Sequence, residues 1–408
     1  MKLSEELVWR NQIKDKTFTD ISWLDDPKTF YLGVDCSSSS MTIGNLAVFM
    51  TARRLLDHGW KAVLLVGGAT SLIGDPGGKD DERQLKSREE IQANVKSIKQ
   101  QVARLFSGKE FTPVDNYDWF KDVGYLEFLR EVGKNYSMTE LLQRDFIATR
   151  IGEGGSGISY AEFSYSLIQG YDYWHLNKTL GVELQIGGSD QWGNMLSGVP
   201  LIRKKENKEV HAFSTPLVVN KATGKKFGKS EDGAVWLDEN LTSVYRFYQF
   251  WLNVDDEGVE EYIKTYTLLS KEEVEKIMVE FISDKAGRLA QRTLAYEVTR
   301  LVHGQEKADA VVNASNILFA GENFLSAGDK EINVLRGELP SVAVGSDLYQ
   351  LLVDSGLAGS KSEARNFHAS GAISVNGQKT LPDQEIIWKS GANLLKRGKN
   401  SFAIVENK

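Results

Sequence analysis

The sequence predicts an α/β protein in which a parallel-sheet domain is followed by a helical domain and a small α+β domain. Three patterns lead to this prediction. The first half alternates short apolar runs with helical periodicity, residues 243–320 carry helical periodicity alone, and the last stretch alternates up to an Asn-Gly turn. A chain of 408 residues also exceeds what one compact core usually holds.

The parallel sheet is predicted from a strand, a helix and a second strand near the N-terminus. Residues 30–34 form a β-rich run, residues 45–58 place an apolar stripe on one helix face, and residues 61–66 are apolar from Ala62 onward. A strand–helix–strand succession implies that the two strands are parallel. A nearly continuous apolar strand is typical of a parallel sheet covered on both faces. Residues 182–186 read as a later strand.

The second and third parts are predicted from helix and hairpin signals. Ser270 and Glu273 have the spacing of a capping box, which starts a helix. The alternating segment Ile373–Lys379 turns at Asn-Gly, which is typical of a hairpin. The predicted boundaries are 1–235 for the sheet domain, 236–325 for the helical domain, 326–345 for a Gly- and Pro-containing linker and 346–408 for the last domain.

Composition excludes several classes of protein. No run of about 18 apolar residues and no signal-peptide pattern is present, so we expect neither membrane contact nor export. The single cysteine, Cys36, agrees with a reducing cytoplasm, and the five scattered histidines predict no structural metal. The net charge is −7, but residues 341–408 carry eight Lys and Arg against six Asp and Glu. This asymmetry is a weak sign of nucleic-acid contact near the C-terminus.

A hydroxyl-rich loop joins the first predicted strand to the first helix. Its sequence from Asp35 to Asn45 is D-C-S-S-S-S-M-T-I-G-N. The N-terminus of the following helix offers unpaired N–H groups and a positive dipole to a phosphate. Gly44 allows a flat ligand to approach the backbone. Taken alone, the loop is equally typical of an exposed Ser-rich turn.

A glycine-rich segment, Gly67–Lys79, directly follows the second predicted strand. It holds five glycines in thirteen residues, which indicates close approach of the backbone to a ligand. Ligands in open α/β sheets bind at the carboxyl ends of the strands. The spacing fits neither a Walker loop nor G-x-G-x-x-G. A flexible turn is the alternative.

Three polar residues share one face of a predicted helix. Tyr165, Gln169 and Asp172 follow one another at spacings of four and three. A phenol, an amide and a carboxylate together suit a small polar ligand that carries an amine or a hydroxyl. A solvated helix face is the alternative.

A second strand-to-turn motif covers Gln185–Asn194, with the sequence Q-I-G-G-S-D-Q-W-G-N. An acidic residue in such a turn commonly holds a ribose hydroxyl.

A lysine loop, defined by the sequence Lys226-Phe227-Gly228-Lys229-Ser230, is the fifth motif. Two lysines beside a glycine can wrap a polyphosphate as mobile point charges. In an acidic chain this cluster predicts a phosphate site, although a solvated basic turn has the same composition.

In this order, the five motifs resemble those of the bacterial type of tyrosyl-tRNA synthetase, a class I aminoacyl-tRNA synthetase, over nearly the whole chain. The lysine loop looks like the family's K-M-S-K-S signature, and Thr42–Asn45 looks like its H-I-G-H signature. The Tyr165 helix and residues 187–194 are the most specific matches and separate tyrosyl from tryptophanyl enzymes. The end of the chain is similar to an RNA-binding module of a small-subunit ribosomal protein.

The resemblance implies a Rossmann-like catalytic domain, an α-helical anticodon-binding domain and a C-terminal RNA-binding domain. It implies that the chain activates L-tyrosine with ATP and Mg²⁺, and then transfers tyrosyl to the terminal ribose of tRNA(Tyr). It also implies a homodimer.

The resemblance also assigns roles to residues. Tyr31 and Asp172 would hold the tyrosine hydroxyl. Asp75, Tyr165 and Gln169 would hold its ammonium group, and Gln191 would lie near its carboxylate and the α-phosphate. Gln185 is also expected to bind tyrosine. Those expected to line ATP are Gly33, Asp35, Ser37, Gly44, Gly188 and Asp190. Those expected to act on the phosphates are Lys226, Lys229, Ser230, Thr42, Asn45, Lys79 and Arg83.

One departure from the family pattern concerns the first signature histidine, which is Thr42 in this chain. Threonine can donate one hydrogen bond but carries no charge. The contact that the family makes to the γ-phosphate is therefore in question, and an inactive paralogue is one alternative. The others are a tryptophanyl enzyme, a different nucleotidyltransferase and an RNA-binding protein without catalysis.

Overall fold

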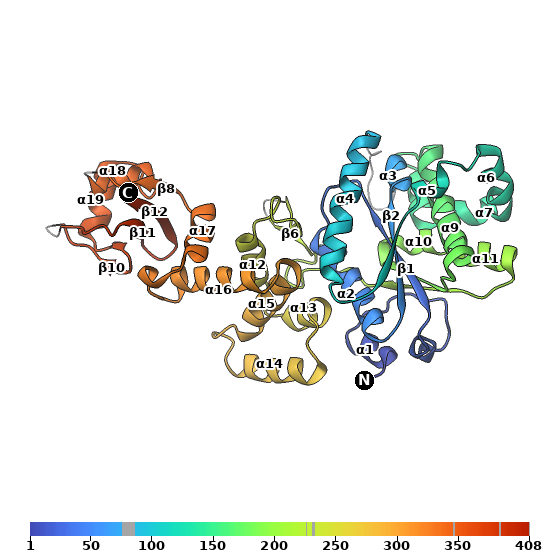
Figure 1. The fold of residues 1–408 in the computed structure, drawn as a ribbon, viewed down its shortest axis with the longest axis horizontal. Coiled ribbons are helices and arrows are strands. Elements are labelled where there is room, and N and C mark those ends of the chain that lie inside the picture. Colours follow the sequence, from blue (N-terminus) through green and yellow to red (C-terminus); the bar gives the residue numbers. More distant parts are fainter. Residues whose placement is uncertain (76–85, 226, 231–232, 346, 383–384, 408) are drawn as a thin grey trace. The chain divides into compact units, whose positions relative to one another are not determined.

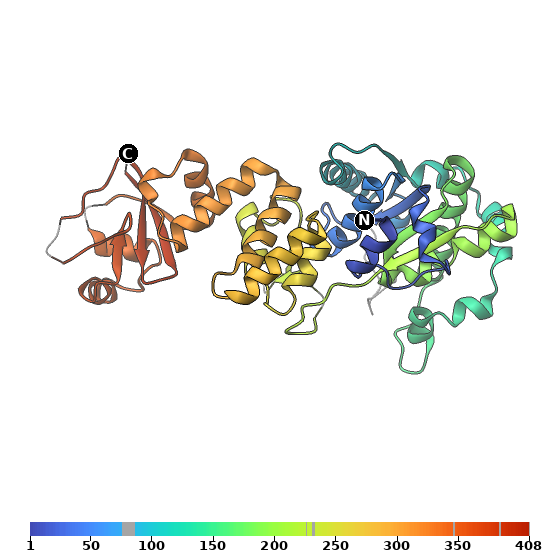
Figure 2. The same ribbon diagram turned by 90° about the horizontal axis from the view of Figure 1, so that it is seen from below.

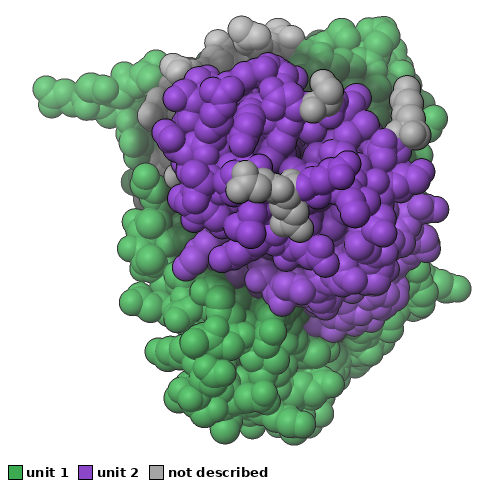
Figure 3. Space-filling view, turned by 90° about the vertical axis from the view of Figure 1, so that its left-hand side faces the viewer, with its two compact units in different colours: residues 1–242, 254–294 green, residues 243–253, 295–408 purple. Residues whose placement is uncertain are grey.

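The computed structural model describes residues 1–75, 86–225, 227–230, 233–345, 347–382 and 385–407. The chain forms two compact units (Figure 3). Unit 1 consists of Met1–Thr242 and Val254–Leu294, and unit 2 consists of Ser243–Asn253 and Ala295–Lys408. This division differs from the predicted three-domain boundaries, which stay a prediction.

Unit 1 is built on a five-stranded parallel sheet with the order β3-β2-β1-β4-β5. Its strands are β1 (Thr29–Asp35), β2 (Lys61–Gly67), β3 (Phe111–Asp115), β4 (Leu184–Gly188) and β5 (His211–Thr215). Tyr31 of β1 pairs with Val63 on one side and with Gln185 on the other. The order reverses direction between β1 and β4, which makes the sheet Rossmann-like and places the ligand crevice at that point. The predicted parallel sheet is confirmed.

Helices cover both faces of this sheet, as Figure 1 shows. On one face lie α2 (Ile43–Asp57) and α4 (Arg88–Leu105), and on the other α9 (Tyr160–Leu180) and α11 (Gly198–Glu206). Tyr31, Val63 and Leu65 pack against side chains of α9 and α11. Their neighbours in the strands are buried as well, because the sheet has no solvated face. This explains why β2 reads as an uninterrupted apolar run.

The remaining elements of unit 1 are short. They are α1 (Leu3–Trp9), η1 (Ile21–Asp25), α3 (Thr70–Ile73), α5 (Tyr117–Phe120), α6 (Tyr125–Glu131), η2 (Gly133–Asn135), α7 (Met138–Leu142), α8 (Asp145–Ile151), η3 (Ser189–Gln191), α10 (Trp192–Met195), β6 (Lys229–Ser230), β7 (Gly233–Ala234), α13 (Val259–Tyr266) and α14 (Lys271–Ser283). Figure 2 shows part of the α6–α8 segment, in teal, standing away from the sheet. At the start of α14, Ser270 and Glu273 form the predicted capping box.

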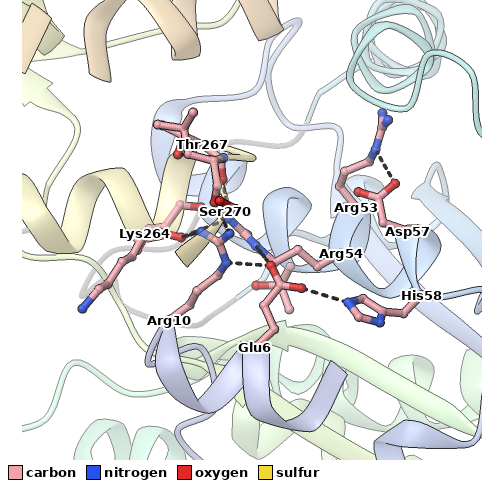
Figure 4. A network of polar contacts seen from close by, with 12 residues as sticks. Glu6, Arg10, Arg53, Arg54, Asp57, His58, Lys264, Thr267 and Ser270 are labelled. Carbon is pink, nitrogen blue, oxygen red and sulfur yellow. Dashed lines mark hydrogen bonds and ion pairs between the residues drawn. The ribbon is translucent and has the colours of Figure 1, made fainter. Parts of the chain in front are cut away.

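A buried polar network joins α1, the C-terminal end of α2 and the end of α13 (Figure 4). Arg54 donates to three carbonyls within residues 264–267, at 2.7 to 3.2 Å. Arg10 donates to the carbonyl of Lys264 at 2.8 Å. These guanidinium groups thus satisfy carbonyls that the end of a helix leaves unpaired. Burial works against the charge of Glu6, but hydrogen bonds from His58 and Arg10 still hold the pKa of Glu6 below its ordinary value.

Residues 243–320 are helical, as predicted. Besides α13 and α14, they contain α12 (Val244–Leu252) in unit 2, α15 (Leu289–His303), which contributes residues to both units, and α16 (Gln305–Phe319) in unit 2.

The segment 326–345, expected to be an irregular linker, contains regular structure instead. After η4 (Phe324–Ser326) it forms α17 (Asp329–Glu338) and β8 (Ser341–Ala343). Leu335 is fully buried among side chains of unit 2, including Phe324 and Phe402. A ten-residue helix shows too few apolar repeats for its periodicity to be evident in the sequence. Packing against the rest of the unit therefore supplies most of its stability.

The last part of unit 2 is a small mixed sheet with two helices. Its elements are α18 (Leu348–Asp354), α19 (Lys361–Ala369), β9 (Ile373–Val375), β10 (Gln378–Lys379), β11 (Gly391–Arg397) and β12 (Ser401–Asn407), in the strand order β10-β9-β11-β12-β8. The predicted hairpin is confirmed, because β9 and β10 pair antiparallel around Asn376 and Gly377. Both turn residues have positive φ, of 50° and 82°, as a two-residue hairpin turn of this kind requires.

Candidate active site

A cavity of about 230 Å³ lies at the carboxyl ends of β1 and β4, the point where the strand order reverses. Four of the five predicted motifs contribute the expected residues to its wall, and the lysine loop contributes Phe227. The predicted residues that line it are Tyr31, Gly33, Asp35, Thr42, Gly44, Asn45, Asp75, Tyr165, Gln169, Asp172, Gln185, Gly188, Asp190 and Gln191. The fold thus gathers residues that are more than 150 positions apart in the chain.

The other predicted residues lie elsewhere or outside the described residues. Ser37 does not line the cavity, and its backbone N–H donates to Asp35 Oδ1 at 2.9 Å. Lys79, Arg83 and Lys226 are outside the described residues. Lys229 and Ser230 form strand β6, and their side chains are likewise outside the description.

The inner end of the cavity holds a buried phenol and a buried carboxyl group. Tyr31 is 1% exposed and Asp172 is 2% exposed. The hydroxyl of Tyr31 has no hydrogen-bond partner among the described residues. A buried polar atom without a partner is costly in a folded protein, so this end of the cavity is suited to a polar group of a ligand.

Two side chains orient the Asp172 carboxyl group. Asn116 Nδ2 donates to Oδ2 at 3.1 Å, and Trp119 Nε1 donates to Oδ1 at 2.9 Å. Burial raises the pKa of Asp172 to about 8, against the lowering effect of these two donors. Burial also raises the pKa of Tyr31, and the charge of Asp172 adds to that shift. Tyr31 is therefore a neutral phenol at neutral pH.

A second polar cluster lies between the glycine-rich segment and the turn after β4. Gln191 Nε2 donates to Asp75 Oδ2, and Asn194 Nδ2 donates to Asp75 Oδ1 at 3.4 Å. Asp75 is 7% exposed, so these amides hold a nearly buried carboxylate in place. Gln185 Oε1 is buried and has no partner among the described residues. The cluster can therefore receive a cationic group at Asp75 and a donor at Gln185.

The outer end of the cavity is formed by the start of α2 and by the turn after β4, where Asn45 and Asp190 are exposed. A Cβ atom on Gly188 would lie 2.6 Å from Asp190 Oδ1, so a side chain there would displace this carboxylate. At the start of α2, Asn45 Oδ1 accepts hydrogen bonds from Thr42 N at 2.9 Å and from Thr42 Oγ1 at 3.0 Å. The Thr42 hydroxyl proton is therefore engaged with the Asn45 side chain.

The lysine loop is held against this same helix start. Phe227 is 5% exposed and its ring stacks on Tyr262 of α13, with 4.3 Å between centroids. A Cβ on Gly228 would lie 3.0 Å from Ile43 Cγ1, so the loop backbone is close to the first residues of α2. Val235 bridges the two segments, since its N–H donates to Gly228 and its carbonyl accepts from Ile43. The two predicted phosphate signatures are therefore neighbours in space.

Comparison with known proteins agrees with this geometry. Residues 25–320 match the family described as tRNA synthetases class I (W and Y), and residues 331–405 match the tyrosine–tRNA ligase SYY-like C-terminal domain. A tyrosine–tRNA ligase of Anaeromyxobacter dehalogenans is 41% identical over 420 residues, which cover 99% of each chain. One of Streptococcus suis is 40% identical over 422 residues, with 99% of this chain and 100% of that one covered. The chain belongs to the tyrosine–tRNA ligases of class I.

The solved structures lead to the same family. A C-terminally truncated mitochondrial tyrosyl-tRNA synthetase of Aspergillus nidulans matches with a TM-score of 0.70 and 32% identity, over 78% of this chain and 94% of that chain. The predicted family, enzyme class and fold class are confirmed.

Sequence reasoning missed two of the residues that shape the inner end of this ligase's cavity. Asn116 and Trp119 hold Asp172, and both follow β3, a strand that the sequence analysis did not identify. Only Val114 and Phe111 mark β3 as apolar, and Pro113 interrupts it. Proline is tolerated there because β3 is an edge strand. Recognising β3 as a strand would have pointed to Asn116, which lies at its carboxyl end.

The described residues include neither a membrane-spanning helix nor a metal-binding cluster. None of the helices there combines the length and the apolar character that crossing a membrane requires. Over the same residues, no cluster of three or more His, Cys, Asp or Glu side chains is arranged to hold a metal ion.

Proposed function

We propose that the chain activates L-tyrosine with ATP and then transfers the tyrosyl group to the 3′-terminal ribose of tRNA(Tyr), releasing AMP and pyrophosphate. The observation that carries this proposal is the buried pair of Tyr31 and Asp172 at the closed end of a cavity whose outer end meets both phosphate signatures. A phenol and a carboxyl group in this position select a ligand that ends in a hydroxyl.

In the proposed complex, tyrosine enters with its ring toward Tyr31 and Asp172. Its hydroxyl donates to the Asp172 carboxylate and accepts from the Tyr31 hydroxyl. Its ammonium group lies near Asp75, Tyr165 and Gln169, where one buried carboxylate balances the charge. The carboxylate of tyrosine then points to Gln191 and to the outer end of the cavity.

We place ATP along the outer end, with its adenosine against Gly33, Asp35, Gly44, Gly188 and Asp190. Mg²⁺ arrives with the phosphates as part of the substrate, because it prefers phosphate and water oxygens to a dedicated protein cage. The tyrosine carboxylate attacks the α-phosphate in line, which forms tyrosyl-adenylate and expels pyrophosphate. The chain contributes mainly orientation and stabilisation of developing charge, through Lys226, Lys229 and the N-terminus of α2.

In the second step, a hydroxyl of the terminal tRNA ribose attacks the carbonyl of the adenylate, and AMP leaves. We assign tRNA contact to the helical part of the chain and to its mildly basic C-terminal part. The test is aminoacylation of a tRNA(Tyr) transcript with labelled tyrosine. Acid-precipitable label that depends on ATP and on this transcript supports the proposal, and label transferred equally to a different tRNA contradicts it.

Tyrosine affinity is expected to rise with pH in the physiological range. The pKa of Asp172 is raised to about 8, so its carboxyl group is mostly protonated in the empty site at neutral pH. A hydrogen bond donated by the tyrosine hydroxyl favours the ionised carboxylate. The dissociation constant should therefore fall as pH rises toward 8, by up to about tenfold per pH unit, and level off above it. Equilibrium dialysis between about pH 6.5 and 8.5 measures this, and Asp172→Asn should flatten the profile. A wild-type profile as flat as that of the variant would contradict the assignment.

Thr42→His is expected to lower the KM for ATP. The Thr42 hydroxyl is engaged with Asn45, so it has no second proton to give to a phosphate. An imidazole restores a donor at the start of α2. Pyrophosphate exchange at varied ATP measures the effect, with Ser38→His in the same loop as the control. An unchanged KM for ATP would show that the lysine loop does not need this partner.

We also propose a cytoplasmic homodimer. Helix α6 and the start of α9 expose large apolar side chains, with Tyr125 62%, Leu126 79% and Tyr160 62% exposed. They flank an apolar cavity of about 360 Å³ that includes Phe120, Phe128 and Ile168. Such a patch on a soluble domain is typical of an interface, and a second copy is the occupant we propose. Sedimentation velocity should show a dimer that Leu126→Asp dissociates, and a monomeric wild type would contradict the proposal.

A further inference from the structure

We propose that Gln101, on α4, is a positioning residue for the ATP site, because it fixes the shape of the hydroxyl-rich loop between β1 and α2. This inference deepens the proposed function and rests on it. Gln101 is 5% exposed and does not line the cavity, so it would act through the loop and not on the substrate.

The Gln101 amide serves three consecutive residues of the loop. Its Oε1 accepts from the Met41 N–H at 3.0 Å and from the Ser40 hydroxyl at 3.2 Å. Its Nε2 donates to the Ser39 carbonyl at 3.1 Å. Both ends of one side-chain amide are therefore used on the segment that directly precedes Thr42.

The loop depends on side chains for its shape. Further along α4, Asn94 Nδ2 donates to the Cys36 carbonyl at 2.9 Å, and the Cys36 N–H donates to Ser71 Oγ at 2.8 Å. A backbone hydrogen bond from Leu237 N to Met41 O, at 2.9 Å, also holds this loop. Buried backbone groups need partners, and in this loop side chains of α4 and Ser71 of α3 supply several of them.

The same anchor reaches the lysine-loop side of the site. Ser40 Oγ, which donates to Gln101 or to the Met41 carbonyl, also accepts from the Asp238 N–H at 3.1 Å. Asp238 continues the segment whose residue Val235 bridges Gly228 and Ile43. Loss of the Gln101 amide should therefore disturb both the start of α2 and the segment 235–238 that follows β7. The Asp172 end of the cavity has separate anchors.

The test compares Gln101→Met with Gln100→Met in pyrophosphate exchange. Methionine keeps the length of the side chain and removes the amide, and Gln100 is the exposed neighbour on the same helix. We expect Gln101→Met to lower kcat/KM for ATP by about tenfold to a hundredfold, since two or three buried hydrogen bonds are lost. The dissociation constant for tyrosine should stay within about twofold of wild type, and Gln100→Met should leave both quantities unchanged.

Gln101→Glu is a second variant, which still tests the proposal if Gln101→Met does not fold. It keeps the oxygen that accepts from Met41 but sets a second oxygen against the Ser39 carbonyl, so the same selective loss for ATP is expected. A wild-type kcat/KM for ATP in either folded variant overturns the proposal. So does a loss of tyrosine affinity as large as the loss for ATP, because that is the result of a general structural role. A wild-type chain without tyrosine-dependent exchange would instead refute the proposed function itself.

Discussion

Replacing Lys229 with alanine is expected to slow adenylate formation by about a hundredfold or more while tyrosine affinity is kept. Lys229 follows Gly228, whose backbone is close to Ile43 at the start of α2, and the proposed complex places the ATP phosphates at that helix. The lysine charge stabilises the transition state, in which pyrophosphate begins to leave, more than it stabilises bound ATP. Its removal therefore lowers the rate of adenylate formation. Single-turnover formation of tyrosyl-adenylate measures the rate, and equilibrium dialysis measures the affinity.

Lys225→Ala is the matched control for this experiment. Lys225 is an exposed lysine of the same turn, four residues before Lys229. Its replacement should leave the single-turnover rate within about twofold of wild type. Equal rates for Lys229→Ala and Lys225→Ala would remove the lysine loop from the mechanism.

Asp172→Ala is expected to remove most of the discrimination between tyrosine and phenylalanine. Selectivity of about 10⁵ against phenylalanine is already known for tyrosyl-tRNA synthetases, and this structure supplies the residues but not the magnitude. A site that hydrogen-bonds a hydroxyl rejects the analogue without it, because the buried partners would be left unpaired. Without the carboxyl group, the ratio of kcat/KM for the two amino acids should fall by about a hundredfold or more.

Two further variants locate this effect. Tyr31→Phe removes the other partner of the hydroxyl and should lower the same ratio. Tyr171 is the neighbour of Asp172 on α9, and its ring packs against Phe120 and Trp174 outside the cavity. Tyr171→Phe should therefore leave the ratio of kcat/KM for tyrosine and phenylalanine unchanged. Undiminished discrimination in Asp172→Ala would show that specificity lies elsewhere.

The central strands of the sheet could be predicted because they are largely buried on both faces, which imposes continuous apolar runs such as residues 62–66. The spacing of Tyr165, Gln169 and Asp172 was compatible with one helix face, and α9 carries all three. Helix α17 could not, since a short helix is stabilised by packing that the local sequence does not reveal.

The candidate site divides in the same way. Residues within one motif, such as Gly188 and Asp190, are evident from a strand followed by a turn. Partners from other parts of the chain are not evident. Asn116, Trp119 and Gln101 each bind a motif that lies 50 or more positions away, and the sequence of that motif does not indicate them. The tertiary fold selects these partners, and the sequence alone indicates only the residues they support.

ATP–pyrophosphate exchange with single amino acids tests the central claim most directly. The account predicts exchange that depends on tyrosine, with tryptophan and phenylalanine giving a small fraction of that rate at equal concentration. Exchange stimulated by tryptophan, or exchange that needs no amino acid, would contradict it.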